Sequence, residues 1–300
     1  MWLTAYGRNY YGQVWPECIE NDYASSYDGI NDYAIATLSP AFLQSNVSGI
    51  TKQWASFWIK DNDTAAQNAG ETMFSQGFSG NSSSNAWYIA YNTRAVNGTN
   101  LNAITFQWQS NGTTNRVVKR WDLFGANTSI TGATSITDFW LSNNSNINVN
   151  ANGYVHLLLV MDVPQGGTAM SNGNYDLYWN GQKLTLNTTP NIEAGNAVLQ
   201  TGSPSLTFGW NNPFSAANSN AQIDEAFFTS AFNGSLFMTE KSLTKDQDIA
   251  DYFYNNGCPV DIGNDGRWDN GWFRFENSWS SEGGITLNPI NGATFTTDHA

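Results

Sequence analysis

Charged residues are scarce in this chain of 300 residues, at 12% of the sequence, about half the usual share. Basic residues are scarcest, with 12 Lys and Arg against 25 Asp and Glu, so the formal net charge is −13. A chain this acidic repels polyanions at long range, which excludes nucleic acid as an expected partner. The charge fits plain solubility, and it leaves open a site for a divalent cation.

Long hydrophobic runs are missing as well. No apolar stretch approaches the ~18 residues that a membrane-spanning helix needs, so we expect no membrane insertion. Residues 1–8 contain no apolar run of the kind found in secretory signal peptides, so we expect no such signal there.

Cysteine and histidine each occur only twice. Cys18 and Cys258 lie near opposite ends of the chain, and we interpret them as two free thiols, with a long-range disulfide as the alternative. His156 lies between Val155 and Leu157 in an apolar run, which favours a hydrogen-bonded core histidine over a general base. This inventory gives no zinc-binding spacing and no nucleophile–base pair.

What the chain has in quantity is aromatic residues and turn formers. Aromatics make up 14% of the sequence, and it contains 27 Gly and 39 Asn. Asn and Gly tolerate the positive φ angles of tight turns, so this composition predicts many short strands around a large apolar core. Sandwiches of this length often form one domain, and we find no linker or repeat.

The chain after about residue 20 is predicted to consist mainly of strands. Residues 157–160 form a buried run, and Asn180-Gly181 is a strong hairpin signal. One helix is predicted after the capping box Thr244–Gln247, and it ends at Gly257. These elements predict an all-β, two-sheet antiparallel jelly-roll sandwich with one short late helix. The predicted strands are 54–60, 86–91, 101–109, 117–123, 154–161, 175–179, 182–186, 205–210, 223–229 and 272–276.

The first 20 residues fit neither helical nor strand periodicity and are rich in aromatic side chains. We interpret residues 1–20 as an arm that docks on the domain or on a partner, and residues 21–300 as the jelly-roll domain. The candidate assembly contacts in the arm are Trp2, Tyr6, Tyr10, Tyr11 and Trp15.

Phrases spread in order over about residues 23–277 resemble the laminin-G-like, concanavalin A-like lectin/glucanase superfamily. The end of the chain is similar to laminin-G-like domains in virion and fibre proteins of tailed phages, especially marine ones. The resemblance implies a lectin-like jelly roll that works by binding. The phrases are Tyr27–Tyr33, Trp54–Lys60, Tyr154–Leu157, Tyr175–Leu184, Ile223–Glu225, Tyr254–Pro259, Gly271–Phe275 and Asn291–Phe295.

The carboxylate pattern of the glucan-cleaving members is missing. Their Glu-x-Asp-x-x-Glu strand begins in this chain at Glu20, but Ser25 occupies the position of the second Glu. Asp224 and Glu225 are neighbours on a predicted strand, where alternation should turn their side chains to opposite faces. We therefore expect no enzyme activity. The resemblance instead suggests a structural Ca²⁺ near Asp28, Asp32 and Asp224, because hard cations take carboxylate oxygens; otherwise no cofactor is expected.

The 13 tryptophans divide into two groups. Trp54, Trp58, Trp179 and Trp272 fall in strand patterns and are assigned to the core. Others lie beside polar residues near strand ends, where an exposed ring could stack on a sugar; subunit contact is the alternative. The candidate carbohydrate-binding residues are Trp210, Asn211, Asn212, Trp268 and Asp269.

Three functional hypotheses follow. The first is a non-enzymatic virion protein, a phage fibre, tail or capsid-decoration subunit that attaches to the host through glycans. Such a subunit would be assembled in the host cytoplasm, contact other virion subunits and form a homo-oligomer. The second is a bacterial extracellular carbohydrate-binding module. The third is a glycoside hydrolase or lyase with an atypical active site.

Overall fold

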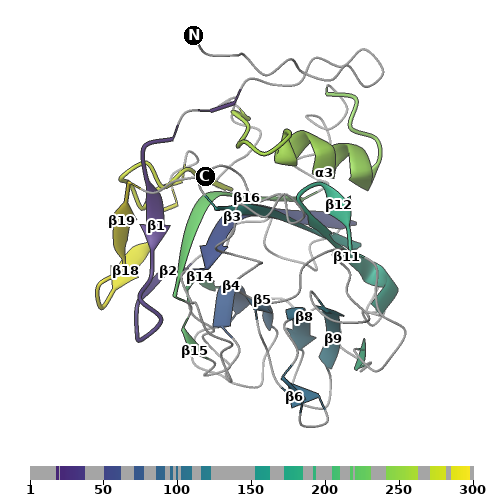
Figure 1. Ribbon diagram of the computed structural model, residues 1–300, viewed down its shortest axis with the longest axis horizontal. Helices are drawn as coiled ribbons and strands as arrows, with labels where there is room; N and C mark the ends of the chain where they lie inside the picture. The colour runs from purple at the N-terminus through teal and green to yellow at the C-terminus, as the bar shows by residue number, and fades with distance from the viewer. Residues whose placement is uncertain are drawn as a thin grey trace.

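The structure is a computed structural model of the full chain, and nineteen strands, one α-helix and a 3-10 turn are assigned in the residues that it describes (Figure 1). The described ranges are 18–19, 21–37, 51–61, 71–77, 86–91, 95–96, 99–100, 103–109, 116–122, 153–162, 172–184, 192–193, 205–209, 217–218, 220–230, 241–262, 271–281 and 285–297.

Two sheets stacked face to face make up the domain. The first sheet has the order β12-β11-β10-β3-β16-β1-β19, with β17 paired to β16. Its strands are β1 (Ala24–Ser26), β3 (Lys52–Asp61), β10 (Val155–Asp162), β11 (Tyr175–Trp179), β12 (Gln182–Lys183), β16 (Ala221–Ser230), β17 (Trp272–Phe273) and β19 (Thr294–Thr296).

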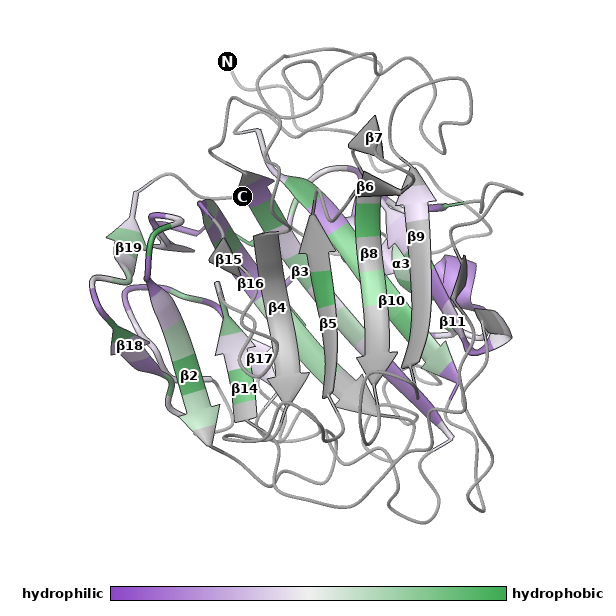
Figure 2. Cartoon of the chain, turned by 90° about the horizontal axis from the view of Figure 1, so that it is seen from below, coloured by the Kyte–Doolittle hydropathy of each residue, from purple (hydrophilic) through white to green (hydrophobic). Residues whose placement is uncertain are grey.

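The second sheet has the order β13-β9-β8-β5-β4-β14-β2-β18, with β15 paired to β4. In Figure 2 its strands lie in front of those of the first sheet. Its strands are β2 (Tyr33–Thr37), β4 (Glu71–Gly77), β5 (Ala86–Tyr91), β8 (Ala103–Gln109), β9 (Arg116–Asp122), β13 (Ile192–Glu193), β14 (Ser205–Phe208), β15 (Ala217–Asn218) and β18 (Asn288–Ile290). A separate ribbon pairs β6 (Ala95–Val96) with β7 (Thr99–Asn100).

These pairings are antiparallel, apart from β15 with β4. The predicted two-sheet sandwich is therefore confirmed. β3 lies between β10 and β16 at the centre of the first sheet, as its apolar residues on both faces predict. The predicted Asn180-Gly181 turn joins β11 to β12, with positive φ at both residues.

The core between the sheets is filled by alternate residues of the strands. Phe57 and Leu157 face it from the first sheet, and Phe106 and Phe208 face it from the second. These side chains are fully buried, since their exposed fraction is 0%. The tryptophans assigned to the core, Trp54, Trp58, Trp179 and Trp272, are all buried as well.

A second apolar layer covers the outer face of the first sheet. Helix α3 (Asp246–Tyr254) lies there, on the side away from the second sheet (Figure 1). Its Ile249 and Phe253 pack against Phe227 of β16, and the rings of Phe227 and Phe253 stack with centroids 5.1 Å apart. The N-cap is Lys245, one residue later than the predicted capping box implies, and the Asp248 carboxylate accepts a hydrogen bond from the Lys245 N–H at 3.1 Å.

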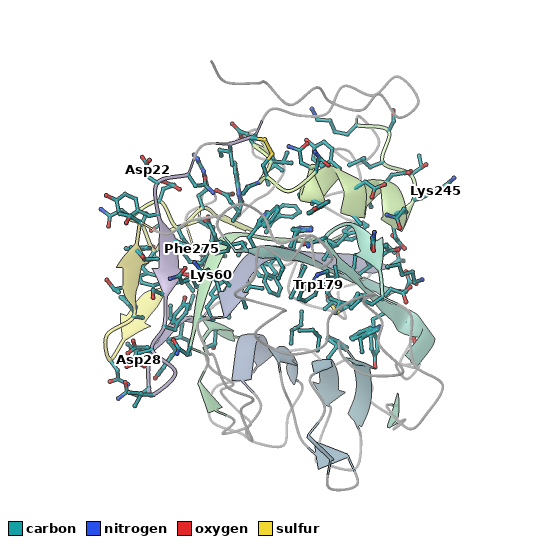
Figure 3. The ribbon with its side chains drawn as sticks, in the orientation of Figure 1. Asp22, Asp28, Lys60, Trp179, Lys245 and Phe275 are labelled. Atoms are coloured by element: carbon teal, nitrogen blue, oxygen red, sulfur yellow. A yellow bond between two sulfur atoms is a disulfide. The ribbon has the colours of Figure 1, made fainter. Side chains whose placement is uncertain are left out.

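The interpretation of the cysteines as free thiols is wrong. Cys18 and Cys258 form a disulfide with Cα atoms 5.6 Å apart, drawn as a yellow bond in Figure 3. The backbone brings the two cysteines together. Cys18 forms an isolated antiparallel β-bridge with Val260, and the Ile19 N–H donates to the Pro259 carbonyl at 3.0 Å. Sequence separation concealed the pairing, since both cysteines lie in short segments without strand periodicity.

The arm residues Trp2, Tyr6, Tyr10, Tyr11 and Trp15 lie outside the described residues. Among the described residues, no helix has the length and apolar character needed to cross a membrane.

Candidate functional site

One end of the sandwich gathers several of the predicted site residues. There β1 finishes, the Tyr27–Asp32 loop crosses to β2, and β14 ends beside the start of β2, with Phe208 opposite Ala34. We call this region the loop end. The Tyr27 side chain is buried, and the Tyr27 backbone N–H donates to the Ala221 carbonyl at 2.9 Å, which fixes the start of the loop against β16.

Gly209 sits directly on the ring of Tyr27. A Cβ at this glycine would lie 2.7 Å from Tyr27 Cδ1, and the residue has a φ of +80°. Only glycine can adopt this positive φ without strain and also leave room for the Tyr27 ring, because it has no Cβ. The contact fixes the point where the chain leaves β14, at the start of the Tyr27–Asp32 loop.

The two carboxylates of this loop have different surroundings. Asp28 is exposed, and its Oδ1 accepts hydrogen bonds from the N–H groups of Ile30 at 2.8 Å and Asn31 at 3.3 Å. Asp32 is buried, and burial together with the nearby Asp28 charge raises its pKa. The loop tip presents Ile30 with 78% of its surface exposed.

The turn between β18 and β19 supports the loop from the side. The Asn291 side chain donates to the Asn31 carbonyl at 3.0 Å. The loop end therefore offers an exposed carboxylate at Asp28 and an exposed aliphatic side chain at Ile30, and Gly209 packs on Tyr27 at its base.

The structure separates the three predicted calcium ligands. Asp28 and Asp32 lie at the loop end, whereas Asp224 is near the other end of β1, in a carboxylate group with Glu225 and Glu276. Figure 3 labels Asp28 at the loop end and Asp22 near this second group.

The candidate sugar-binding residues Trp210, Asn211, Asn212, Trp268 and Asp269 lie outside the described residues, and only their flanks are described. Gly209, the residue before the first segment, lies at the loop end. The chain enters β17 from the opposite direction, because β17 runs antiparallel to β16 and towards the loop end.

A β-bulge creates the second carboxylate group. The pairing of β16 with β3 shifts register between Asp224 and Phe227, and Glu225 has a φ of +45°. The predicted alternation, with Asp224 and Glu225 on opposite faces, is wrong because the bulge rotates Glu225 out of the regular pleat. Oxygens of Asp224, Glu225 and Glu276 lie within 4.8 Å of one another.

Each of these carboxylates has some protein donors. The Glu225 N–H donates to Asp224 Oδ1 at 2.9 Å, and the Trp272 indole donates to Glu225 Oε2 at 2.5 Å. The Asp22 N–H lies 3.1 and 3.0 Å from the two oxygens of Glu276. Burial, followed by the neighbouring Asp224 charge, raises the pKa of Glu225 well above its usual range.

Asn21 reaches the same group from the segment before β1. Its Nδ2 donates to Asp224 Oδ2 at 3.1 Å, while its Oδ1 is buried without a hydrogen-bond partner. The sequence did not mark Asn21, Glu225 or Glu276 as metal ligands. The sequence did contain one signal, the adjacent acidic residues Asp224 and Glu225 in a predicted strand. Two neighbouring buried carboxylates require either a local irregularity of the strand or a compensating charge.

A small cavity lies between the first sheet and α3. Its volume is about 10 Å³, the size of one water, and Ser56, Glu225, Phe253 and Trp272 are among its lining residues. Ser56 Oγ lies 2.8 Å from His156 Nε2, and burial lowers the pKa of His156 to about 3. This Ser–His pair is a core contact, as predicted for His156, because the cavity cannot admit a substrate.

No known family model matches the chain, and no curated protein matches it. Among solved structures, it is similar to a heptameric SAP-like pentraxin from Limulus polyphemus, with 8% identity over 92% of this chain and 94% of that one and a TM-score of 0.45. It is also similar to the binding domain of botulinum neurotoxin serotype D, with 18% identity over 70% of this chain and a TM-score of 0.38. The match covers 39% of the neurotoxin structure. Likenesses at these scores carry no argument about what this chain binds.

Proposed function

We propose that this protein is a non-enzymatic, lectin-like adhesion subunit, displayed on a phage particle, that binds host glycans at its loop end. The ligand site would consist of Trp210, Asn211 and Asn212 together with the Tyr27–Asp32 loop. An indole ring stacks on the apolar face of a sugar, and amide and carboxylate groups bind its hydroxyls.

The contact between Gly209 and Tyr27 carries this proposal. It holds Gly209, the residue before Trp210, against Tyr27, which directly precedes the exposed Asp28 in a loop whose tip is Ile30. The proposed site would combine the aromatic ring of Trp210 with the aliphatic side chain of Ile30 and the carboxylate of Asp28. Such a set of groups suits a shallow sugar site better than a deep catalytic one.

The disulfide supports display outside the cell. Disulfides persist on secreted proteins and on virion and cell surfaces, whereas the reducing cytosol keeps most thiols free. The Cys18–Cys258 bond would thus form after assembly or release, when the particle meets oxidising surroundings.

A glycan array tests the ligand site. Wild-type protein should bind a defined set of glycans, and Trp210→Ala should abolish that binding. Trp268→Ala is the matched control, because its segment enters the first sheet from the opposite direction and should leave binding intact. Loss of binding in Trp268→Ala with retention in Trp210→Ala would move the site away from the loop end.

A particle assay tests the display. The protein should form a homo-oligomer and co-purify with virions, and removal of the aromatic arm should prevent incorporation. The deletion should end at residue 17, because Cys18 and Ile19 are attached to the domain. A folded monomer that never joins particles would favour a free bacterial carbohydrate-binding module.

The hydrolase alternative has its own test. Asp224, Glu225 and Glu276 do converge, but Asp224 and Glu225 are buried and the cavity that Glu225 lines has a volume of only about 10 Å³. We therefore expect no release of reducing ends from a polysaccharide panel. Release that is lost in Glu225→Gln would overturn the non-enzymatic assignment.

A further inference from the structure

Trp279 is the one half-exposed tryptophan among those whose side chains the structure describes. It lies in the segment between β17 and β18 and packs against the rim of the core between the sheets. A ring in this position is partly available to a ligand, whereas buried indoles are not. The other tryptophans with described side chains have at most 6% of their surface exposed, and they are Trp54, Trp58, Trp121, Trp179 and Trp272.

Three aromatic rings hold Trp279 at this rim. Its ring centroid lies 4.5 Å from that of Phe295, 6.1 Å from that of Phe275 and 6.5 Å from that of Tyr27. Phe275 and Tyr27 are buried, while Phe295 is half-exposed like Trp279 itself. The Leu287 N–H donates to the Trp279 carbonyl at 2.8 Å, which fixes the backbone as well. Trp279 and Phe295 therefore form a fixed aromatic pair, which we call the rim platform.

Polar groups accompany the rings of the rim platform. The Trp279 indole N–H donates to no acceptor in the described part of the chain, and it is not among the buried polar atoms that lack a partner, so it is open to solvent. The neighbouring side chains of Ser278, Ser280 and Thr294 are exposed and carry hydroxyl groups. An aromatic face beside a free donor and several hydroxyls suits a sugar better than a purely apolar ligand.

The rim platform adjoins the loop end. Tyr27, whose ring contacts Trp279, is the first residue of the Tyr27–Asp32 loop. Phe295 lies on β19 opposite Ser25 of β1, directly before that loop. Figure 1 shows β18 and β19 beside β1 at one edge of the sandwich. A ligand at the loop end can therefore reach the platform.

The charge of this edge selects the kind of sugar. The segments that build it, residues 21–37 and 277–297, contain no Lys or Arg. Asp28 is exposed in the first of them, and Asp32 lies close behind it. A carboxylate or sulfate group on a ligand would find no cation in these segments and would be repelled by the carboxylates, whereas an uncharged sugar would not.

We propose, on the basis of the glycan-binding function above, that the rim platform is the stacking subsite for a neutral pyranose sugar. The sugar packs its apolar face on the ring of Trp279, and the indole N–H donates to one of its hydroxyls. Phe295 supports the indole ring from the side, and the Tyr27–Asp32 loop borders the subsite.

A glycan array with neutral, sialylated and sulfated glycans, combined with NMR of the indole N–H groups, tests the subsite. Wild type should bind neutral glycans, and Trp279→Ala should weaken that binding by about tenfold or more. Trp279→Phe keeps a ring on the core but removes the donor, so it should fold like wild type and bind more weakly. The spectrum of Trp279→Phe identifies the Trp279 signal, which should shift in wild type as the methyl glycoside of a bound hexose is added. Trp268→Ala is the control and should bind like wild type.

The subsite and the glycan-binding function fail in different ways. If wild type binds no glycan at all, the function is wrong and the subsite with it. If wild type binds neutral glycans but Trp279→Phe binds them equally well and the Trp279 signal does not move, the rim platform alone is refuted and the function stands. Binding of sialylated or sulfated glycans in preference to neutral ones would overturn the assignment of a neutral sugar.

Discussion

The Ser56 hydroxyl and the His156 imidazole pair across two central strands of the first sheet, with Oγ 2.8 Å from Nε2. The two residues lie on neighbouring strands, and the backbone register sets Ser56 opposite Leu158, with His156 opposite Trp58. The His156 ring lies 5.2 Å from the ring of Trp58, centroid to centroid, and the other ring nitrogen, Nδ1, has no hydrogen-bond partner. The pair is a buried polar contact inside an apolar layer.

Removing one partner of this contact should cost more than removing both. Ser56→Ala leaves a buried imidazole nitrogen unpaired, which costs about 1–3 kcal/mol of unfolding free energy. The double variant Ser56→Ala/His156→Leu removes both polar groups, so its loss should be smaller than the sum of the single losses. Urea unfolding of the four proteins measures the coupling, and strictly additive losses would contradict it.

His156 should also make stability depend on pH. Its pKa falls from 6.5 to about 3 in the folded protein because burial disfavours the imidazolium. Between these values the unfolded chain binds more protons, so the contribution is complete above pH 6.5 and is lost as the pH falls towards 3, with a slope of up to about 1.4 kcal/mol per pH unit.

The pH effect is measured as a difference between wild type and His156→Leu. Glu225 acts in the opposite sense above its ordinary pKa of 4.5, because its folded pKa is raised, but it is common to both proteins. The unfolding free energies of wild type and His156→Leu should be measured at several pH values from 4 to 7, which lie mostly between the folded and unfolded pKa values of His156. The two values should approach each other as the pH falls. Parallel curves for the two proteins would show that His156 does not titrate as burial predicts.

The disulfide should contribute strongly to stability. It joins residues 240 positions apart, and the chain-entropy model gives on the order of 5 kcal/mol for a loop of that length. Cys18→Ser/Cys258→Ser should therefore lower Tm substantially. Thiol titration in denaturant should find no free thiol without reductant and two after reduction, and two thiols in unreduced protein would refute the bond.

Gly209→Ala should destabilise the loop end by two mechanisms, a positive φ and a clash with the Tyr27 ring. Together these cost on the order of 2–4 kcal/mol. Gly257→Ala is the matched control, because Gly257 has a φ of +100° but the nearest atom to an added Cβ is the Tyr254 hydroxyl at 3.7 Å. Thermal unfolding should show a larger loss for Gly209→Ala, and equal losses would remove the argument for a close contact.

Most strands of the sandwich could be predicted because their periodicity is local. The prediction for 86–91 matches β5, and that for 54–60 falls within β3. The helix was predicted with an early cap, because Thr244 has the usual N-cap chemistry whereas the structure starts the helix after Lys245. Element ends depend on single residues, and single residues give weak signals.

The carboxylate group near Asp224 could not be predicted, because it depends on contacts across more than 200 residues. Asn21 meets Asp224 at a separation of 203, and Asp22 meets Glu276 at a separation of 254. The bulge that brings Glu225 to the group could not be predicted either, because strict alternation of side chains along a strand assumes that no bulge is present. The pairing of Cys18 with Cys258 has the same origin, since only the finished sandwich brings the two ends of the chain together.

The covalent bond between positions 18 and 258 also decides how the molecule bears mechanical load. A pull on the residues before Cys18 passes through the sulfur atoms to Cys258, just beyond the end of α3, before it can reach β1. The short β1 strand, with three residues, is thereby spared the unzipping force that would otherwise peel it from β16 and β19. A force applied to the residues before Cys18 would therefore act on α3 and the apolar layer on the outer face of the first sheet. The loop end, at Tyr27–Asp32, would keep its shape.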